Sequence, residues 1–330
     1  MRSAHTRSAA ELPSARGPLS DQVIARLTQG SGGNSLEVAD ADPFDDDTQL
    51  ALYVCYELHY RGFVDVDDEH EWDPVLLTFR RELERRFMGA VRDSVGALPT
   101  TVSADDEMAE LSVEPIDGEG LSYELRDNGT WEQFRDLFAL RSLYHHKEAD
   151  PHAWAIPRLR HQAKAAFVAV EFDEFGAGRG DAVHQELFTD LMGAAGLRTD
   201  YLAYLDDAPW WALAPVNLMS CFGLHRSLRG ATVGHLAATE ITSPPGSQRL
   251  LAGLERLDAP ESCRHFYREH VEADAVHEQI LRTDVVGSLI LDEPALERDI
   301  VFGMRAFLAM EDAFGEGLRG SWIEGIPAMA

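Results

Sequence analysis

The residue pattern with the clearest chemical meaning is a set of two histidines and an aspartate on one predicted helix. His270, Asp274 and His277 lie in the helical stretch 260–284, four and then three positions apart. Residues at i, i+4 and i+7 share one face of an α-helix, so the imidazoles and the carboxylate would point in the same direction. Such a set suits iron, manganese or zinc. Ordinary polar residues on an acidic helix would show the same spacing, so both interpretations stay open.

A second group of metal-type side chains flanks a glycine-rich interruption. Glu174 ends one predicted helix and His184 lies in the next, with the run Phe-Gly-Ala-Gly-Arg-Gly between them. Glycine at this density is typical of a backbone that must bend sharply. A plain inter-helix loop is the alternative. A phosphate-binding loop is disfavoured, because no strand precedes the run and no Gly-Lys-Ser/Thr ending follows it.

Two further glutamates have the character of buried ligands. Glu240 follows a stretch rich in Ala and Leu and precedes Pro244 and Pro245. A carboxylate among small apolar residues is costly to bury unless it is paired or binds a metal. Glu148 lies near the end of another predicted helix, although Lys147 beside it offers a surface ion pair as the simpler explanation.

The elements that must position these residues are almost all helical. Apolar residues recur at helical spacing throughout the chain, and no βαβ rhythm is present, which predicts an all-α bundle. The expected helices are 20–28, 48–60, one following Pro74, 130–147, 158–175, 181–195, 198–204, 215–242, 247–257, 260–284 and 293–314. Pro215 is expected in the first turn of its helix and a break at 243–246. Within 97–128, the stretches starting at Leu111 and Leu121 are compatible with short strands or with extended loop.

This pattern divides the chain into two parts. Residues 1–46, rich in Gly, Ser, Pro and Asp, are expected to be mostly irregular apart from one short helix. Residues 47–330 are expected to form a single domain, with accessory helices and a loop over 47–128 and the metal-binding core over 129–330.

Composition excludes several partners. The chain has 57 acidic and 29 basic residues, a formal net charge of −28, which disfavours binding to nucleic acid or an anionic membrane. Its three cysteines have no Cys-x-x-Cys spacing, as expected in a reducing compartment. No apolar stretch approaches about 18 residues and the first residues lack an apolar leader. We therefore expect a cytoplasmic protein without a membrane span; a homodimer is left open.

Taken in order, these residues resemble the haem-oxygenase-like dimetal oxidase family. The resemblance covers roughly 130–285 and includes the phrases Asp-Glu-Phe-Gly-Ala-Gly-Arg, His-Arg-Ser-Leu-Arg-Gly and His-Val-Glu-Ala-Asp-Ala-Val-His. It implies a haem-oxygenase-like helical bundle with additional N-terminal helices, and a site for two irons without haem, manganese being the alternative metal. The implied ligands are Glu148, Glu174, His184, Glu240, His270, Asp274 and His277.

The resemblance also implies a function. The protein would activate O2 to oxidise a small amine or amino-acid-like substrate in specialised metabolism, with N-oxygenation favoured. Desaturation, C–C fragmentation and oxidative cyclisation of an amino acid are the alternatives at the same site. A ferritin-like iron-binding or ferroxidase protein is the alternative from another class, disfavoured because the chain has no Glu-x-x-His pair.

Three other residues near these ligands carry open assignments. Asp181 has Asp-x-x-His spacing to His184 and is a possible alternative to Glu174 as a ligand. Arg229 and Arg226 precede Glu240 on the same predicted helix and could bind a substrate carboxylate, although a salt bridge is the simpler role. No catalytic residue is expected beyond the metal ligands.

Overall fold

The computed structural model of the chain describes residues 9–29, 35–38, 41–113, 115 and 117–325, and only the backbone of 272–275. Its α-helices are α1 (Pro18–Gln29), α2 (Asp46–Glu57), α3 (Pro74–Val95), α4 (Ala104–Leu111), α5 (Leu121–Asn128), α6 (Trp131–His145), α7 (Asp150–Ala153), α8 (His161–Glu174), α9 (His184–Ala194), α10 (Trp210–Leu224), α11 (Arg229–Arg256), α12 (Glu261–Ile280), α13 (Ser288–Asp292) and α14 (Glu297–Glu324). The only β contact among the described residues is an isolated bridge between Ala10 and Phe63. The all-α prediction is confirmed.

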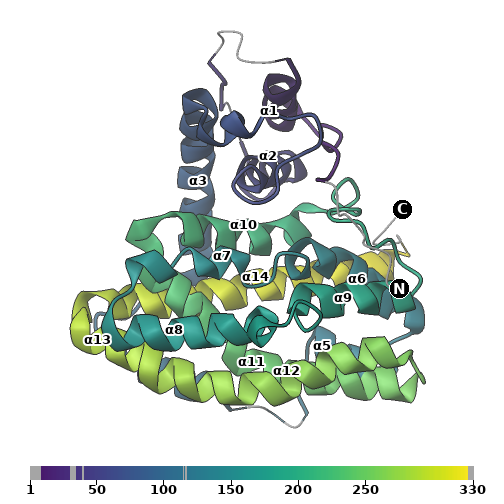
Figure 1. The fold of residues 1–330 in the computed structure, drawn as a ribbon, viewed down its shortest axis with the longest axis vertical. Coiled ribbons are helices and arrows are strands. Elements are labelled where there is room, and N and C mark those ends of the chain that lie inside the picture. The colour runs from purple at the N-terminus through teal and green to yellow at the C-terminus, as the bar shows by residue number, and fades with distance from the viewer. Residues whose placement is uncertain (1–8, 30–34, 39–40, 114, 116, 326–330) are drawn as a thin grey trace.

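The helices are arranged around α11, which packs along both α12 and α14 (Figure 1). α8 and α9 lie against α12, and α10 covers the opposite side, where α2 packs on it. The N-terminal helices α1 and α2 share one hydrophobic core with α6, α9, α10 and α14. No helix among the described parts of the chain is both long and apolar enough to cross a membrane.

A glycine contact brings α11 and α14 unusually close together. A Cβ added at Gly303 of α14 would lie 2.1 Å from the carbonyl oxygen of Ala231, and one added at Gly234 of α11 would lie 1.9 Å from that of Ile300. Real side chains cannot be accommodated at such distances. These two glycines therefore set the position of α11, which carries Glu240.

The predicted helix 215–242 is wrong in its boundaries. The structure has two helices here, separated by His225, whose backbone is extended (φ −99°, ψ 112°), and by a 3₁₀ turn, Arg226–Leu228. Because α10 begins at Trp210, Pro215 lies inside the helix and not in its first turn.

The predicted break at 243–246 is also wrong, since α11 continues through Pro244 and Pro245 to Arg256. Contacts with α12 and α14 along α11 outweigh the cost of two interior prolines. The prolines lack the N–H groups that would bond to the carbonyls of Glu240 and Ile241. The backbone hydrogen bonding of α11 is thus weakened at the residue predicted to bind metal.

Two other expectations are corrected. The segment 198–204 is not a helix: it is irregular up to a bend at Asp200 and continues as turns, and the left-handed backbone of Leu202 (φ 58°) cannot continue a right-handed helix. The stretch 97–128 contains the short helices α4 and α5, not strands. At the start of α4 the Ser103 side chain accepts a hydrogen bond from the Asp106 N–H and caps the helix. The apolar pattern gave no indication of this cap.

A buried ion pair ties the N-terminal helices to the core beside Glu148. The Lys147 ammonium pairs with Glu57 of α2, and both side chains are almost fully buried. Tyr201 donates to the other oxygen of Glu57 at 2.8 Å. The surface ion pair suggested for Lys147 and Glu148 is therefore wrong: Lys147 belongs to a separate network.

Candidate metal centre

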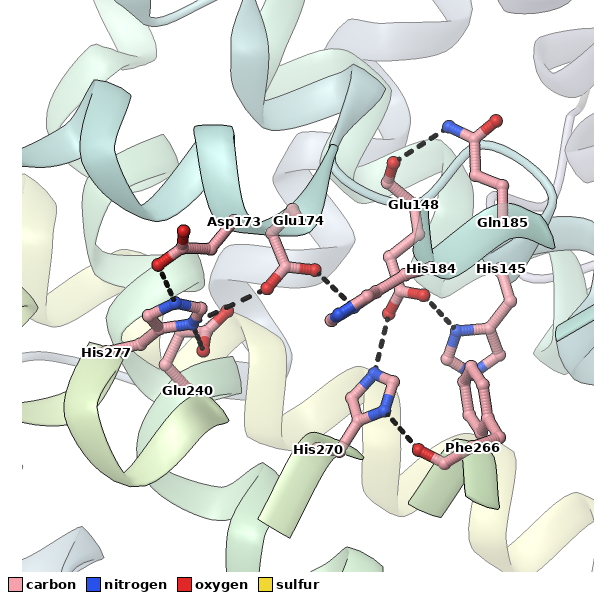
Figure 2. A network of polar contacts seen from close by, with 10 residues as sticks. All are labelled: His145, Glu148, Asp173, Glu174, His184, Gln185, Glu240, Phe266, His270 and His277. Carbon is pink, nitrogen blue, oxygen red and sulfur yellow. Dashed lines mark hydrogen bonds and ion pairs between the residues drawn. The ribbon is translucent and has the colours of Figure 1, made fainter. Parts of the chain in front are cut away.

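The candidate ligands come from five parts of the chain that meet between α8, α11 and α12 (Figure 2). Glu148 lies in the turn that follows α6, Glu174 is the last residue of α8 and His184 the first of α9; Glu240 belongs to α11, and His270 and His277 belong to α12. Each of these six side chains is less than a tenth exposed. The fold brings these six side chains together in two clusters.

The first cluster consists of Glu148, His184 and His270. One ligand atom from each lies within 4.8 Å of the other two. Glu148 Oε1 is 3.5 Å from His270 Nε2. Burial would raise the pKa of Glu148, but the neighbouring His145 and His270 hold it well below its usual range. The carboxylate is therefore ionised and available to a cation.

The second cluster consists of Glu174, Glu240 and His277, again with ligand atoms within 4.8 Å of one another. His277 Nδ1 is 3.1 Å from Glu240 Oε2 and 3.5 Å from Glu174 Oε1. Two carboxylates and one imidazole nitrogen thus face a common point.

Glu174 joins the two clusters. Its Oε1 faces His277 and its Oε2 lies 2.7 Å from His184 Nδ1 (Figure 2). The glycine-rich loop makes this possible, because Gly176 adopts φ 76° and a Cβ there would lie 2.7 Å from Val183 N. The glycines therefore fold the chain back so that Glu174 and His184 face each other.

Several buried polar atoms of the clusters lack a well-aligned hydrogen-bond partner. Glu148 Oε2, Glu174 Oε1 and His184 Nδ1 make no aligned hydrogen bond, although Glu174 and His184 are close. Leaving buried polar atoms in this condition is expensive. A cation shared between these oxygen and nitrogen atoms would satisfy their lone pairs. The donor set therefore fits metal ions held by carboxylate and imidazole groups.

Two contacts orient the histidines of α12 for ligation. His270 Nδ1 lies 2.8 Å from the Phe266 carbonyl oxygen, which can only accept, so Nδ1 carries a proton and Nε2 is the nitrogen that faces Glu148. Asp173 Oδ2 lies 3.3 Å from His277 Nε2, while Nδ1 of the same ring faces Glu240 and Glu174 of the second cluster. An outer carbonyl or carboxylate that fixes the tautomer is usual around metal-ligating histidines.

Sequence reasoning missed three residues of this region. His145 Nδ1 lies 3.0 Å from Glu148 Oε2, and Asp173 contacts His277. Glu171, one turn before Glu174 on α8, is 2% exposed. A carboxylate three positions before a candidate ligand on one helix was a usable signal for Glu171, whereas nothing in the spacing indicated Asp173.

A small cavity, partly open to solvent, lies beside the clusters. Its lining comprises Tyr144, Glu148, Ala149, His152, Glu171, Glu174, Leu236, Thr239, Glu240, Ser243 and His270. Tyr144 of α6 is one of these lining residues. A small molecule bound there would lie against residues of both clusters.

The remaining predicted residues lie apart from the two clusters. Asp181 is an exposed loop residue. Arg229 pairs with Glu293, and Arg226 belongs to the 3₁₀ turn before α11; neither lines the cavity. The side chain of Asp274 lies outside the described residues, so its place as a ligand stays a prediction.

A third cluster, Glu84, Cys221 and His225, also has ligand atoms within 4.8 Å. Here Arg80 Nε lies 3.1 Å from Glu84 Oε1, and the Tyr56 hydroxyl donates to the same oxygen. Burial raises the pKa of the Cys221 thiol to about 12. A carboxylate already paired with a guanidinium beside a protonated thiol is a structural network, not a metal site.

A comparison with known protein families gives a match over much of the chain. Residues 135–312, which is more than half of the chain, match the family described as iron-containing redox enzyme. The match spans α6 to α14 and includes all six clustered ligands and Asp274. No curated protein matches the chain.

Proposed function

Because the chain belongs to the iron-containing redox enzyme family, we propose that it is an O2-dependent oxidase that holds two irons and oxidises a small amine or amino-acid-like molecule. The observation that carries this proposal is the position of Glu174, with one carboxylate oxygen toward each cluster. Carboxylates and histidines from facing helices are how helical bundles hold two irons.

The charges of the donor set support two divalent ions. Glu148, Glu174 and Glu240, together with Asp274, supply four negative charges, which neutralise two Fe(II). The imidazoles of His184, His270 and His277 add ligands without adding charge. Hard carboxylates favour iron or manganese over softer metals.

The irons, when bound, would supply the electrons that reduce O2. The protein supplies position and surroundings. Phe266 and Asp173 orient the rings of His270 and His277. The buried Lys147–Glu57 pair anchors the turn that carries Glu148, and Leu236 and Ala149 contribute apolar surface that limits water beside the clusters.

Among the possible reactions we favour N-oxygenation, because the pattern of four carboxylates resembles the N-oxygenating members of the family. Desaturation, C–C fragmentation and oxidative cyclisation use the same site and would differ in their products. Gain of an oxygen atom, loss of two hydrogens and loss of a carbon fragment are distinguishable by mass.

Anaerobic loading with Fe(II) followed by O2 tests the proposal. We expect two irons per chain, and O2 consumption that depends on an added amine and yields an oxidised product. A protein that binds no iron would contradict the metal assignment. Iron that is oxidised and stored without any organic product would instead favour a ferroxidase.

A further inference from the structure

One carboxylate in the cavity is left over after the two clusters are assembled. Of the described lining residues, Glu148, Glu174, Glu240 and His270 belong to the clusters. Glu171 lines the same cavity but is in neither cluster. It therefore needs an explanation of its own.

Glu171 is buried and incompletely paired. Its side chain is 2% exposed and its Oε2 has no hydrogen-bond partner. Burial, followed by the nearby charges of Glu174 and Glu240, raises its pKa well above the usual range. A carboxylate in this position is costly to ionise unless a cation is brought to it.

The described lining of the cavity offers no such cation. It contains neither lysine nor arginine. His152 also lines it, and burial lowers the pKa of this imidazole to about 4, so it is neutral at physiological pH. Since the cluster carboxylates would neutralise two Fe(II), a cation that ionises Glu171 would have to come with a bound ligand.

We propose that Glu171 is the residue that anchors an ammonium group of the substrate, an assignment that rests on the proposed function for the chemistry next to it. His152 offers a neutral polar group on the same cavity: its Nδ1 has no hydrogen-bond partner, while its Nε2 lies 3.0 Å from His235 Nδ1. The hydroxyls of Thr239 and Ser243 lie on the same cavity.

This anchoring restricts the substrate. A protonated nitrogen has no lone pair, so the ammonium held by Glu171 is not the atom that is oxygenated. The substrate must carry its reacting nitrogen or carbon elsewhere in the molecule. Molecules with a recognition ammonium and a second reactive group, such as diamines and basic amino acids, meet this requirement.

Calorimetry on the anaerobic Fe(II)-loaded protein and on the metal-free protein tests the assignment without turnover. The probe is butylammonium, with 1-butanol as its neutral counterpart of equal length. We expect the wild type to prefer butylammonium by at least about tenfold, and Glu171→Gln to lose that preference, because the neutral amide cannot form the buried charged pair with the ammonium. Glu124→Gln, which alters an exposed glutamate of α5, should behave as the wild type.

The same samples separate this assignment from the iron site. Glu171→Gln should keep the iron content of the wild type. Loss of iron from Glu171→Gln would show that Glu171 is a metal ligand and would overturn its assignment as the ammonium anchor. The assignment would also be overturned if Glu171→Gln bound butylammonium as the wild type does, or if the wild type showed no preference for butylammonium over 1-butanol. Failure of iron loading in the wild type would contradict the proposed function alone, because the preference for butylammonium can still be measured in the metal-free protein.

Discussion

His184 Nδ1 lies 2.7 Å from Glu174 Oε2 across the glycine-rich loop that separates α8 from α9. The proximity raises the pKa of His184 even though burial opposes its protonation; the carboxylate of Glu174 is the cause. Since the other oxygen of Glu174 faces His277, a change at this one glutamate should affect both clusters.

We expect Glu174→Ala to lose most bound iron at both positions, whereas Asp181→Ala keeps the iron content and activity of the wild type. Glu174 faces both clusters, and Asp181 is exposed and in neither. Iron analysis after anaerobic loading and desalting measures the difference. The reverse result would move this ligand position to Asp181.

His277→Ala and Glu240→Ala should each reduce O2-dependent turnover to below about one hundredth of the wild type, because each removes a ligand of the second cluster. Far-UV circular dichroism should change little, since the packed apolar core holds the helices together. His265→Ala, which alters a half-exposed histidine on the same helix, serves as the control. Full activity in His277→Ala would contradict a metal role for α12.

Gly303→Ala should destabilise the protein by about 2 kcal/mol or more, because its Cβ would collide with the backbone of α11 and overpacking carries a cost of this size. Gly320→Ala on the same helix has open space around the added carbon and should be neutral or slightly stabilising. Urea unfolding of both variants measures the effect. Equal stability would show that α11 and α14 can separate without cost.

Protonation of His152 should destabilise the metal-free protein at low pH. Burial lowers its folded pKa to about 4, whereas an unfolded histidine titrates near pH 6.5, so the unfolded state binds more protons between these values. The stability contributed by neutral His152, about 3 kcal/mol at most, is present above pH 6.5 and lost as the pH falls toward 4.

His152→Asn should make the free energy of unfolding less dependent on pH in this window. Urea unfolding of the metal-free wild type and variant at several pH values measures the slope. An unchanged slope would mean that the buried imidazole is not the titrating group.

The sequence by itself determined the helical class and pointed to the six candidate ligands that the structure brings together in two clusters. The periodicity of apolar residues fixed the greater part of the helices, and the spacing of His270 and His277 placed them on one face of α12, because helical geometry is local. Glu148, Glu174, His184 and Glu240 were found through their order and resemblance to a family, which the match to residues 135–312 supports.

Tertiary structure decided what local patterns cannot. Packing carried α11 through two prolines that predicted a break, and folding at Gly176 determined that Glu174, not the exposed Asp181, faces His184. Side chains from separate helices meet at the site, and this determines that Glu174 joins the two clusters. It also determines that Glu171 lies on the same cavity with no lysine or arginine in the described lining. Such distances are set by the close approach of α11 to α14 and by burial, neither of which leaves a periodic signal in the sequence.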